Sequence, residues 1–212
     1  TLGTMNSSTP MTDEEFLEDR RNALRESVEY FSGKNKPERE RWVCHEFIQN
    51  LGLSYDESEV VTPYDEPPDV VFRDCRFEIK ELLDPGRRRH AEYKASLQKA
   101  LEITDPQDLL KQFTPQDITP QQIGDRILKE LDALQQRYAP STRRHLDILF
   151  YVNLQEHFLK AGAMPPAVEF ASYGWRSVSA IMGWGALVMC AAPDAPAFLV
   201  SNVGALMQRK FE

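Results

Sequence analysis

Cysteine is scarce in this sequence of 212 residues, and the cysteines that it has are far apart. Cys44, Cys75 and Cys190 are odd in number and widely spaced, which argues against a disulfide framework and a cysteine-based zinc site. The four histidines include no pair spaced for one face of a helix. We therefore expect the chemistry of this chain to rest on other residue types.

Long apolar runs are also missing. No run approaches the length that spans a bilayer, and the polar start has neither the basic nor the apolar region of a secretory signal. The sequence contains no Gly-rich phosphate loop and no serine in a nucleophile elbow. We expect a cytoplasmic protein without a membrane segment, and the 42% of apolar residues is enough for a globular core.

Positive charge is in deficit, because 25 Lys and Arg face 33 Asp and Glu, for a net charge of −8. Proteins that bind nucleic acid usually carry a basic surface that neutralises phosphates. The balance can still be local, since the sequence has two basic clusters, Arg87-Arg88-Arg89 and Arg143-Arg144. Each cluster is either a phosphate contact or a solvated loop or helix end, and we expect at least one to contact phosphate.

Residues 67–81 contain the most informative pattern in the sequence, a predicted hairpin with a cluster of charged side chains. An apolar run at 70–72, a polar break at 73–74 and an alternating run from Phe77 predict a β-hairpin. Side chains alternate across a strand, so Glu78 and Lys80 share one face. Asp69 opens the first strand, and its carboxylate can converge on Glu78. Two carboxylates and an ammonium suit a hard divalent cation with a lysine beside the metal-bound water.

Pro68-Asp69 followed by Glu78-Ile79-Lys80 resembles the signature of the PD-(D/E)xK nuclease superfamily, which includes restriction endonucleases and Holliday-junction resolvases. The wider chain is similar to a small bacterial family described only as "putative endonucleases" of unknown role. The resemblance implies that Mg²⁺ or Mn²⁺ is bound by Asp69, Glu78 and the backbone carbonyl of Ile79. It also implies that Lys80 orients or deprotonates the attacking water.

A carboxylate two residues before a lysine is a common pattern, and this chain has a second one at Glu92-Tyr93-Lys94. That second match lies in a helical pattern without a preceding hairpin, so we set it aside. The alternative for Glu78 and Lys80 is an exposed strand face that carries an ordinary Glu–Lys pair. The Pro-Asp step and the strand–turn–strand context favour the site.

Two helices are predicted before the hairpin. Thr12 and Glu15 form a capping-box pattern that begins a helix over about 13–31, and Pro37 suits the first turn of a second helix that ends at Gly52. Glu40 lies on the same side of this second helix as its buried stripe and is our candidate for an additional metal ligand. Glu46 is the second choice. The alternative is that Glu40 is an exposed first-turn acid favoured by the helix dipole.

The remaining pattern extends the resemblance to about residues 37–152. It predicts a strand at 59–62, helices over 87–102 and 120–138, and a strand buried on both faces at 145–152. We therefore predict an α/β fold with a restriction endonuclease-like α-β-β-β-α-β core and a mixed sheet. Residues 1–11 are expected to be a disordered leader and 12–212 a single nuclease-like domain, with 153–212 as a C-terminal extension.

The extension is predicted from shorter signals. Residues 154–160 suggest a short helix, and 168–170, 186–191 and 197–201 suggest strands that extend the sheet or cover one face. Trp175 and Trp184 stand beside glycines, where a tryptophan either packs into the fold or stacks on a base.

Two functions remain open from the sequence. The first is a divalent-metal-dependent endonuclease that hydrolyses phosphodiester bonds in DNA, with RNA as the second choice of substrate. The other is a catalytically inactive nuclease-like fold that acts as a protein- or nucleic-acid-binding regulatory module, which the acidic net charge favours. A homodimer is compatible with either function.

Overall fold

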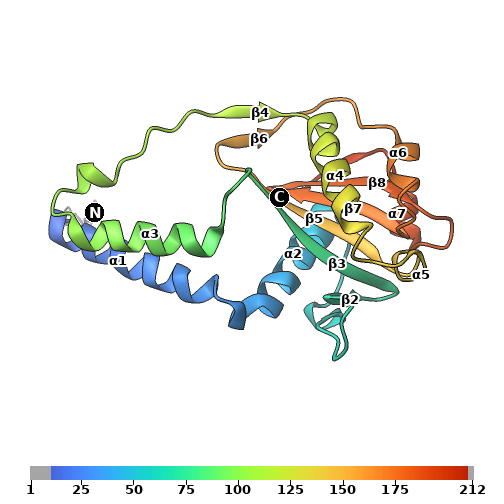
Figure 1. Cartoon of the computed structure of the whole chain (residues 1–212), viewed down its shortest axis with the longest axis horizontal. Helices are drawn as coiled ribbons and strands as arrows, with labels where there is room; N and C mark the ends of the chain where they lie inside the picture. Colours follow the sequence, from blue (N-terminus) through green and yellow to red (C-terminus); the bar gives the residue numbers. More distant parts are fainter. Residues whose placement is uncertain (1–10, 210–212) are drawn as a thin grey trace, which may run out of the picture. The chain divides into compact units, whose positions relative to one another are not determined.

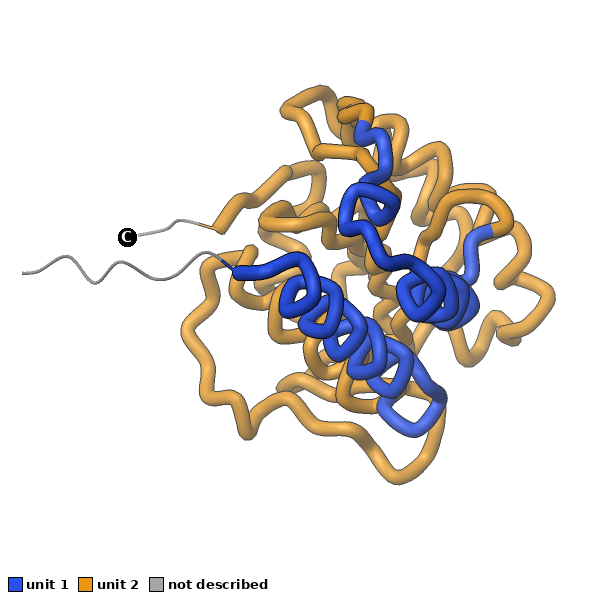
Figure 2. Tube along the Cα trace, turned by 90° about the vertical axis from the view of Figure 1, so that its left-hand side faces the viewer, with its two compact units in different colours: residues 1–35, 87–113 blue, residues 36–86, 114–212 orange. Residues whose placement is uncertain are grey.

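The structure, a computed structural model, describes residues 11–209 (Figure 1). Contacts within the chain divide it into two compact units, Thr1–Asn35 with Arg87–Phe113 and Lys36–Gly86 with Thr114–Glu212 (Figure 2). The predicted leader lies outside the described residues except for Met11. The interpretation of 12–212 as a single domain stays a prediction.

Unit 1 is built on two helices, α1 (Asp13–Tyr30) and α3 (Arg89–Glu102), with short helical turns η1 (Gly33–Asn35) and η3 (Pro106–Leu109). The predicted capping box begins α1, since the Glu15 carboxylate accepts a hydrogen bond from the Thr12 N–H at 2.8 Å. Arg21 joins the helices by donating to the carbonyl of Ala100 at 2.9 Å. The rings of Phe31 and Tyr93 stack at 4.8 Å between centroids.

Unit 2 contains a seven-stranded sheet in the order β1-β2-β3-β5-β7-β8-β9. The central strands β3, β5 and β7 are parallel to one another, and the remaining pairs are antiparallel. The bounds are β1 Val60–Val61, β2 Val70–Phe72, β3 Cys75–Leu83, β5 Asp147–Asn153, β7 Ser177–Met182, β8 Gly185–Ala191 and β9 Leu206–Gln208. A separate parallel pair consists of β4 (Gln116–Ile118) and β6 (His157–Leu159).

Helices cover both faces of the large sheet. One face packs against α4 (Pro120–Leu134), whose Ile123 and Ile127 are fully buried with Ile148 and other residues of β5. The other face packs against α2 (Lys36–Asn50) through Phe47. Consecutive residues of β5 therefore lie in different cores, as predicted for a strand buried on both faces.

The predicted α/β class is confirmed, and α2, β1, β2, β3, α4 and β5 follow in the predicted order. After residue 153, the central strand β7 was not predicted, and three short predicted elements have a different structure. Residues 168–170 and 197–201, where strands were expected, belong to the helices α6 (Ala167–Ala171) and α7 (Ala197–Val200). Residues 154–160, where a helix was expected, include strand β6. Pro166 and Pro196 directly precede the two helices, and proline lacks the N–H donor that a strand ladder needs. Short apolar runs do not distinguish helix from strand by periodicity.

No helix among residues 11–209 combines the length and the apolar character that crossing a membrane requires.

Candidate functional site

Asp69 is fixed at the entrance to β2 by bonds to the neighbouring strand. Its backbone N–H donates to the carbonyl of Phe77 at 3.0 Å, which ties the residue before β2 to β3. Its carboxylate Oδ2 accepts a hydrogen bond from the backbone N–H of Ile79 at 2.9 Å. The Asp69 carboxylate is therefore buried and held beside the residue that separates Glu78 from Lys80.

Glu78 and Lys80 form an ion pair on one face of β3. Tyr138, beyond the end of α4, donates its hydroxyl hydrogen to the same Glu78 Oε1 at 2.5 Å. The Lys80 ammonium also lies 5.7 Å from the centre of the Tyr138 ring. The tyrosine thus fixes the glutamate and borders the lysine.

Lys80 is held in its charged form by these contacts. Burial opposes the charge, but the hydrogen bond and the negative charge of Glu78 outweigh it and raise the pKa of Lys80. Asp69 adds in the same direction, so its charge reaches Lys80 as well. In this state Lys80 can orient a water molecule or stabilise negative charge, but it cannot accept a proton.

A second lysine lies among three carboxylates on the α2 side. The ammonium of Lys36, the first residue of α2, is 2.9 Å from Asp69 Oδ1, 3.1 Å from Glu40 Oε1 and 3.5 Å from Glu66 Oε1. Burial opposes its charge, but hydrogen bonds to Asp69 and Glu40 raise the pKa of Lys36 above its usual value. Burial, followed by the negative charge of Asp69, raises the pKa of Glu40 to about 7.

The structure therefore brings most of the predicted residues together but divides the acids between two ammonium groups. Asp69 and Glu40 contact Lys36, whereas Glu78 contacts Lys80 and Tyr138. Within residues 11–209, no group of three or more His, Cys, Asp or Glu side chains has an arrangement that could hold a metal ion. Three-acid coordination would require Glu78 to turn from its present partners.

Part of the cluster fits a hard cation. Asp69 and Glu40 are buried carboxylates that already share one positive charge, the ammonium of Lys36. The N–H of Ile79 points toward Asp69, and the N–H and carbonyl of one residue leave a strand on the same side, so the Ile79 carbonyl faces this region too. Carboxylate and carbonyl oxygens are the ligands that Mg²⁺ and Mn²⁺ prefer.

Glu46, the reserve ligand, is not part of this cluster. Its carboxylate accepts a bond from Arg209 at 2.8 Å. Lys36 and Tyr138 are the residues of the site that the sequence pattern did not single out. Lys36 stands four residues before Glu40, which is a recognisable ion-pair spacing in a helix. No local pattern indicates that Tyr138 reaches Glu78, 60 residues away in sequence.

The predicted basic clusters have different surroundings. In unit 1, Arg87 pairs with Glu92 at 2.8 Å and the Arg89 guanidinium lies 3.8 Å from the centre of the Phe31 ring, while Arg88 is exposed. In unit 2, Arg144 is exposed. Arg143 is 8% exposed, and its Nε and Nη1 are buried without an acceptor in the described part of the chain.

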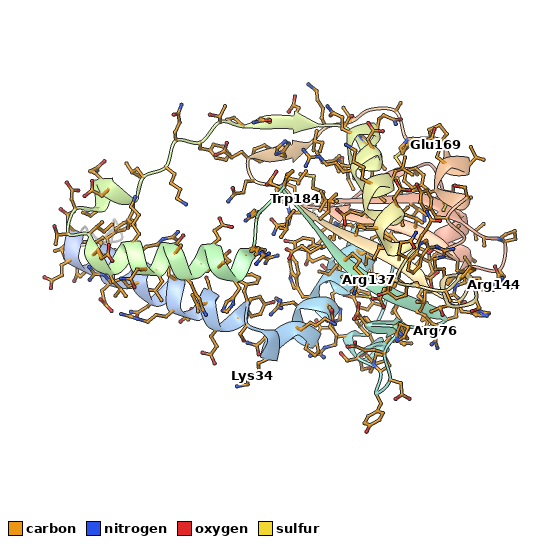
Figure 3. All side chains as sticks on the ribbon, viewed as in Figure 1. Lys34, Arg76, Arg137, Arg144, Glu169 and Trp184 are labelled. Carbon is orange, nitrogen blue, oxygen red and sulfur yellow. The ribbon has the colours of Figure 1, made fainter. Side chains whose placement is uncertain are left out.

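Exposed arginines that were not predicted accompany Arg144. Arg76 is on β3, two residues before Glu78 and on the same face, and Arg137 directly precedes Tyr138. Figure 3 shows Arg76, Arg137 and Arg144 around the start of β3 and the end of α4. Their side chains form no ion pair with any residue from 11 to 209. We call these three residues the arginine face.

Comparisons with known proteins place the chain in a family. A family model described as "Putative endonuclease, protein of unknown function (DUF1780)" matches residues 12–211. A solved structure from Pseudomonas aeruginosa strain PAO1, described as a protein of unknown function of the monooxygenase superfamily, is 26% identical. The match covers 98% of this chain and 97% of that chain, with a TM-score of 0.64. No curated protein matches. Because the family model covers almost the whole length, the chain belongs to the family described as "putative endonuclease, protein of unknown function".

Proposed function

We propose that this protein is a divalent-metal-dependent endonuclease that hydrolyses phosphodiester bonds, with DNA as its substrate. The main support for this proposal is the hydrogen bond from the Ile79 N–H to Asp69. It holds the Asp69 carboxylate, which follows Pro68, against the strand that contains Glu78, Ile79 and Lys80. Membership of a family described as endonucleases supports the same chemistry. The PD-(D/E)xK assignment is part of this proposal.

Each residue of the site has a role in the proposal. Asp69, Glu78, Glu40 and the Ile79 carbonyl would hold Mg²⁺ or Mn²⁺. When bound, such an ion stabilises negative charge on the phosphate and makes a bound water easier to deprotonate. Lys80 keeps its ammonium beside this centre and donates to the phosphate or the attacking water. In the metal-free arrangement Tyr138 bonds Glu78 and borders Lys80, and Glu78 would turn from these partners to reach the ion.

The arginine face gives the substrate a place to bind despite the net charge of −8. Phosphate contacts supply most of the affinity of proteins for DNA, and exposed arginines can donate two hydrogen bonds to one phosphate. Arg76 shares the strand face of Glu78, so a phosphodiester held by this face runs toward Lys80. Arg144 is a stronger candidate for this contact than Arg143, two of whose nitrogens are enclosed. Arg87, Arg88 and Arg89 remain further candidates in unit 1.

A cleavage assay tests the proposal. Supercoiled plasmid, linear duplex, single-stranded DNA, branched DNA and RNA would each be incubated with Mg²⁺ or Mn²⁺. Lys80→Ala should lose cleavage by roughly 10²-fold or more, as expected when a group that acts on the attacking water is removed. Lys94→Ala is the matched control, because Lys94 ends the second Glu-x-Lys pattern and is exposed on α3. Equal activity of the two variants would contradict the assigned site.

One observation favours a second function, that of a binding module without catalysis. Lys36 and Lys80 already form ion pairs with the acids of the site, which is what a nuclease-like fold without metal would need. Absence of Mn²⁺ binding together with retained binding of DNA or a protein would support this alternative.

The description of the Pseudomonas structure raises oxygenation as a different chemistry. In unit 2, a cavity of about 510 Å³ lined by Tyr151, His157, Trp184 and other residues offers space for an organic substrate. Substrate-dependent oxygen uptake that is unaffected by Asp69→Asn would favour that chemistry over hydrolysis.

A further inference from the structure

We propose that Lys36 is an internal counter-ion that occupies the cation position of the site, so that a divalent ion binds only when the Lys36 ammonium leaves. This inference rests on the proposed metal-dependent function. It assigns to Lys36 control over metal affinity, a role distinct from that of Lys80.

The contacts of Lys36 resemble those of a bound cation. Its ammonium reaches carboxylates from two segments of the chain, Glu40 on α2 and both Glu66 and Asp69 in the connection before β2. Asp69 divides its two oxygens, with Oδ2 on the Ile79 N–H and Oδ1 on Lys36. The oxygen that a metal ion would use is therefore the one that the lysine occupies.

A divalent ion and the ammonium cannot share this position. Mg²⁺ approaches its oxygen ligands to about 2.0–2.1 Å, and it would repel a positive charge on the same oxygen. Asp69 Oδ1 lies 2.9 Å from the Lys36 nitrogen, so an ion at that oxygen would stand against the ammonium. Metal binding and the Lys36 contact therefore compete at Asp69.

The acids hold the Lys36 ammonium in place, but its exposed side chain can still move into solvent. It is the first residue of α2, where the helix dipole disfavours a positive charge, so the acids hold it rather than the helix. The side chain is 47% exposed, whereas that of Asp69 is 4% exposed. A flexible lysine can therefore move its ammonium into solvent while the carboxylates keep their positions.

Removal of this charge has two opposite consequences. Without Lys36, the carboxylates of Glu40, Asp69 and Glu66 repel one another, so the metal-free protein loses stability. The same change removes the competing charge, so a divalent ion binds more tightly. A lysine with a purely structural role would produce the first effect without the second.

The test is a Mn²⁺ titration of the full chain by calorimetry, with thermal unfolding measured at each metal concentration. Lys36→Met should bind Mn²⁺ at least tenfold more tightly than the wild type, and Lys36→Arg, which keeps the charge, should not. Lys36→Met should also unfold at a lower temperature without metal and gain more from Mn²⁺. Lys34→Met is the matched control, since Lys34 is an exposed lysine two residues earlier (Figure 3).

A measurement on the wild type covers the case in which Lys36→Met does not fold. Amine acetylation followed by mass spectrometry measures the accessibility of each lysine. Addition of Mn²⁺ should increase the labelling of Lys36 and leave that of Lys34 unchanged. Unchanged labelling of Lys36 at saturating Mn²⁺ would overturn the proposal.

The outcomes separate this inference from the proposed function. If the wild type binds Mn²⁺ through Asp69 and Lys36→Met binds it equally well, Lys36 does not compete and only the inference is wrong. If no variant binds Mn²⁺, the metal-dependent function fails and the inference fails with it. If only Lys36→Met binds, the inference holds and the wild-type site is blocked.

Discussion

The carboxylate of Asp69 accepts a hydrogen bond from the backbone N–H of Ile79 at 2.9 Å. This bond joins the two parts of the sequence signature, the Pro-Asp step before β2 and the Glu-x-Lys segment of β3. It leaves Asp69 Oδ1 facing Lys36, while Glu78 pairs with Lys80. The site is therefore two adjacent acid–lysine clusters connected through one backbone amide.

Replacement of Tyr138 by phenylalanine should loosen Glu78. The change removes a 2.5 Å hydrogen bond to a carboxylate that is 4% exposed, and it should cost about 1.5 kcal/mol of unfolding free energy, the low end for a bond to a charged group. Urea unfolding measures the loss. Tyr173→Phe is the control, because the Tyr173 hydroxyl bonds Asp132 at the surface and should cost less. Equal losses in the two variants would contradict a special role for Tyr138.

The two candidate acids of α2 should behave differently. Glu40→Gln removes a carboxylate that contacts Lys36 beside Asp69, and it should weaken Mn²⁺ binding about tenfold, a difference of about 1.4 kcal/mol. Glu46→Gln should leave Mn²⁺ affinity unchanged, since Glu46 pairs with Arg209. Calorimetric titration of both proteins decides the point. Weaker binding in Glu46→Gln alone would reverse the assignment of the ligand.

The arginine face should govern affinity for DNA. Alanine at Arg76, Arg137 or Arg144 should weaken binding to all sequences and reduce the slope of log K against log salt by about 0.9 for each phosphate that is no longer neutralised. Fluorescence anisotropy in the Asp69→Asn background measures binding without cleavage. Arg73→Ala serves as the control, because Arg73 is engaged by Glu59 at 2.7 Å. A salt slope that is unchanged in all three variants would exclude this face.

Cys190 should make stability fall at alkaline pH. Burial raises the pKa of the Cys190 thiol to about 11 in the folded chain, compared with about 8.5 for an unfolded thiol. The folded state therefore favours the neutral thiol. Its contribution to stability is complete below about pH 8.5 and is lost as the pH rises through about 11. Urea unfolding of the wild type and Cys190→Ala at several pH values should show the difference between them changing in this window. A constant difference would contradict the shift.

The sequence predicted the hairpin and the adjacent core well, because their signals are local. Alternation in 70–80, the capping box at Thr12 and the apolar run at 145–152 each correspond to an observed element. The short elements after 153 were wrong where four or five apolar residues fit a helix or a strand equally well. Proline at 166 and 196 was the better signal.

The partners of the site residues were harder to predict. Asp69, Glu78, Lys80 and Glu40 follow from motif spacing and helical periodicity. The choice between Lys36 and a metal ion as the partner of Asp69 depends on how α2 approaches β2, which no local pattern encodes. The approach of Tyr138 to Glu78 depends in the same way on the packing of α4 against the sheet. Tertiary contacts between distant segments therefore decided what the motif alone left open.

The most direct test of the account compares wild type and Asp69→Asn in one experiment that follows both Mn²⁺ binding and DNA cleavage. Asparagine keeps an oxygen for the Ile79 N–H, so the fold should persist by circular dichroism while the charge is lost. The account predicts that the wild type binds Mn²⁺ and cleaves DNA only with metal, and that Asp69→Asn does neither. Metal-dependent cleavage that persists in Asp69→Asn would contradict the central claim.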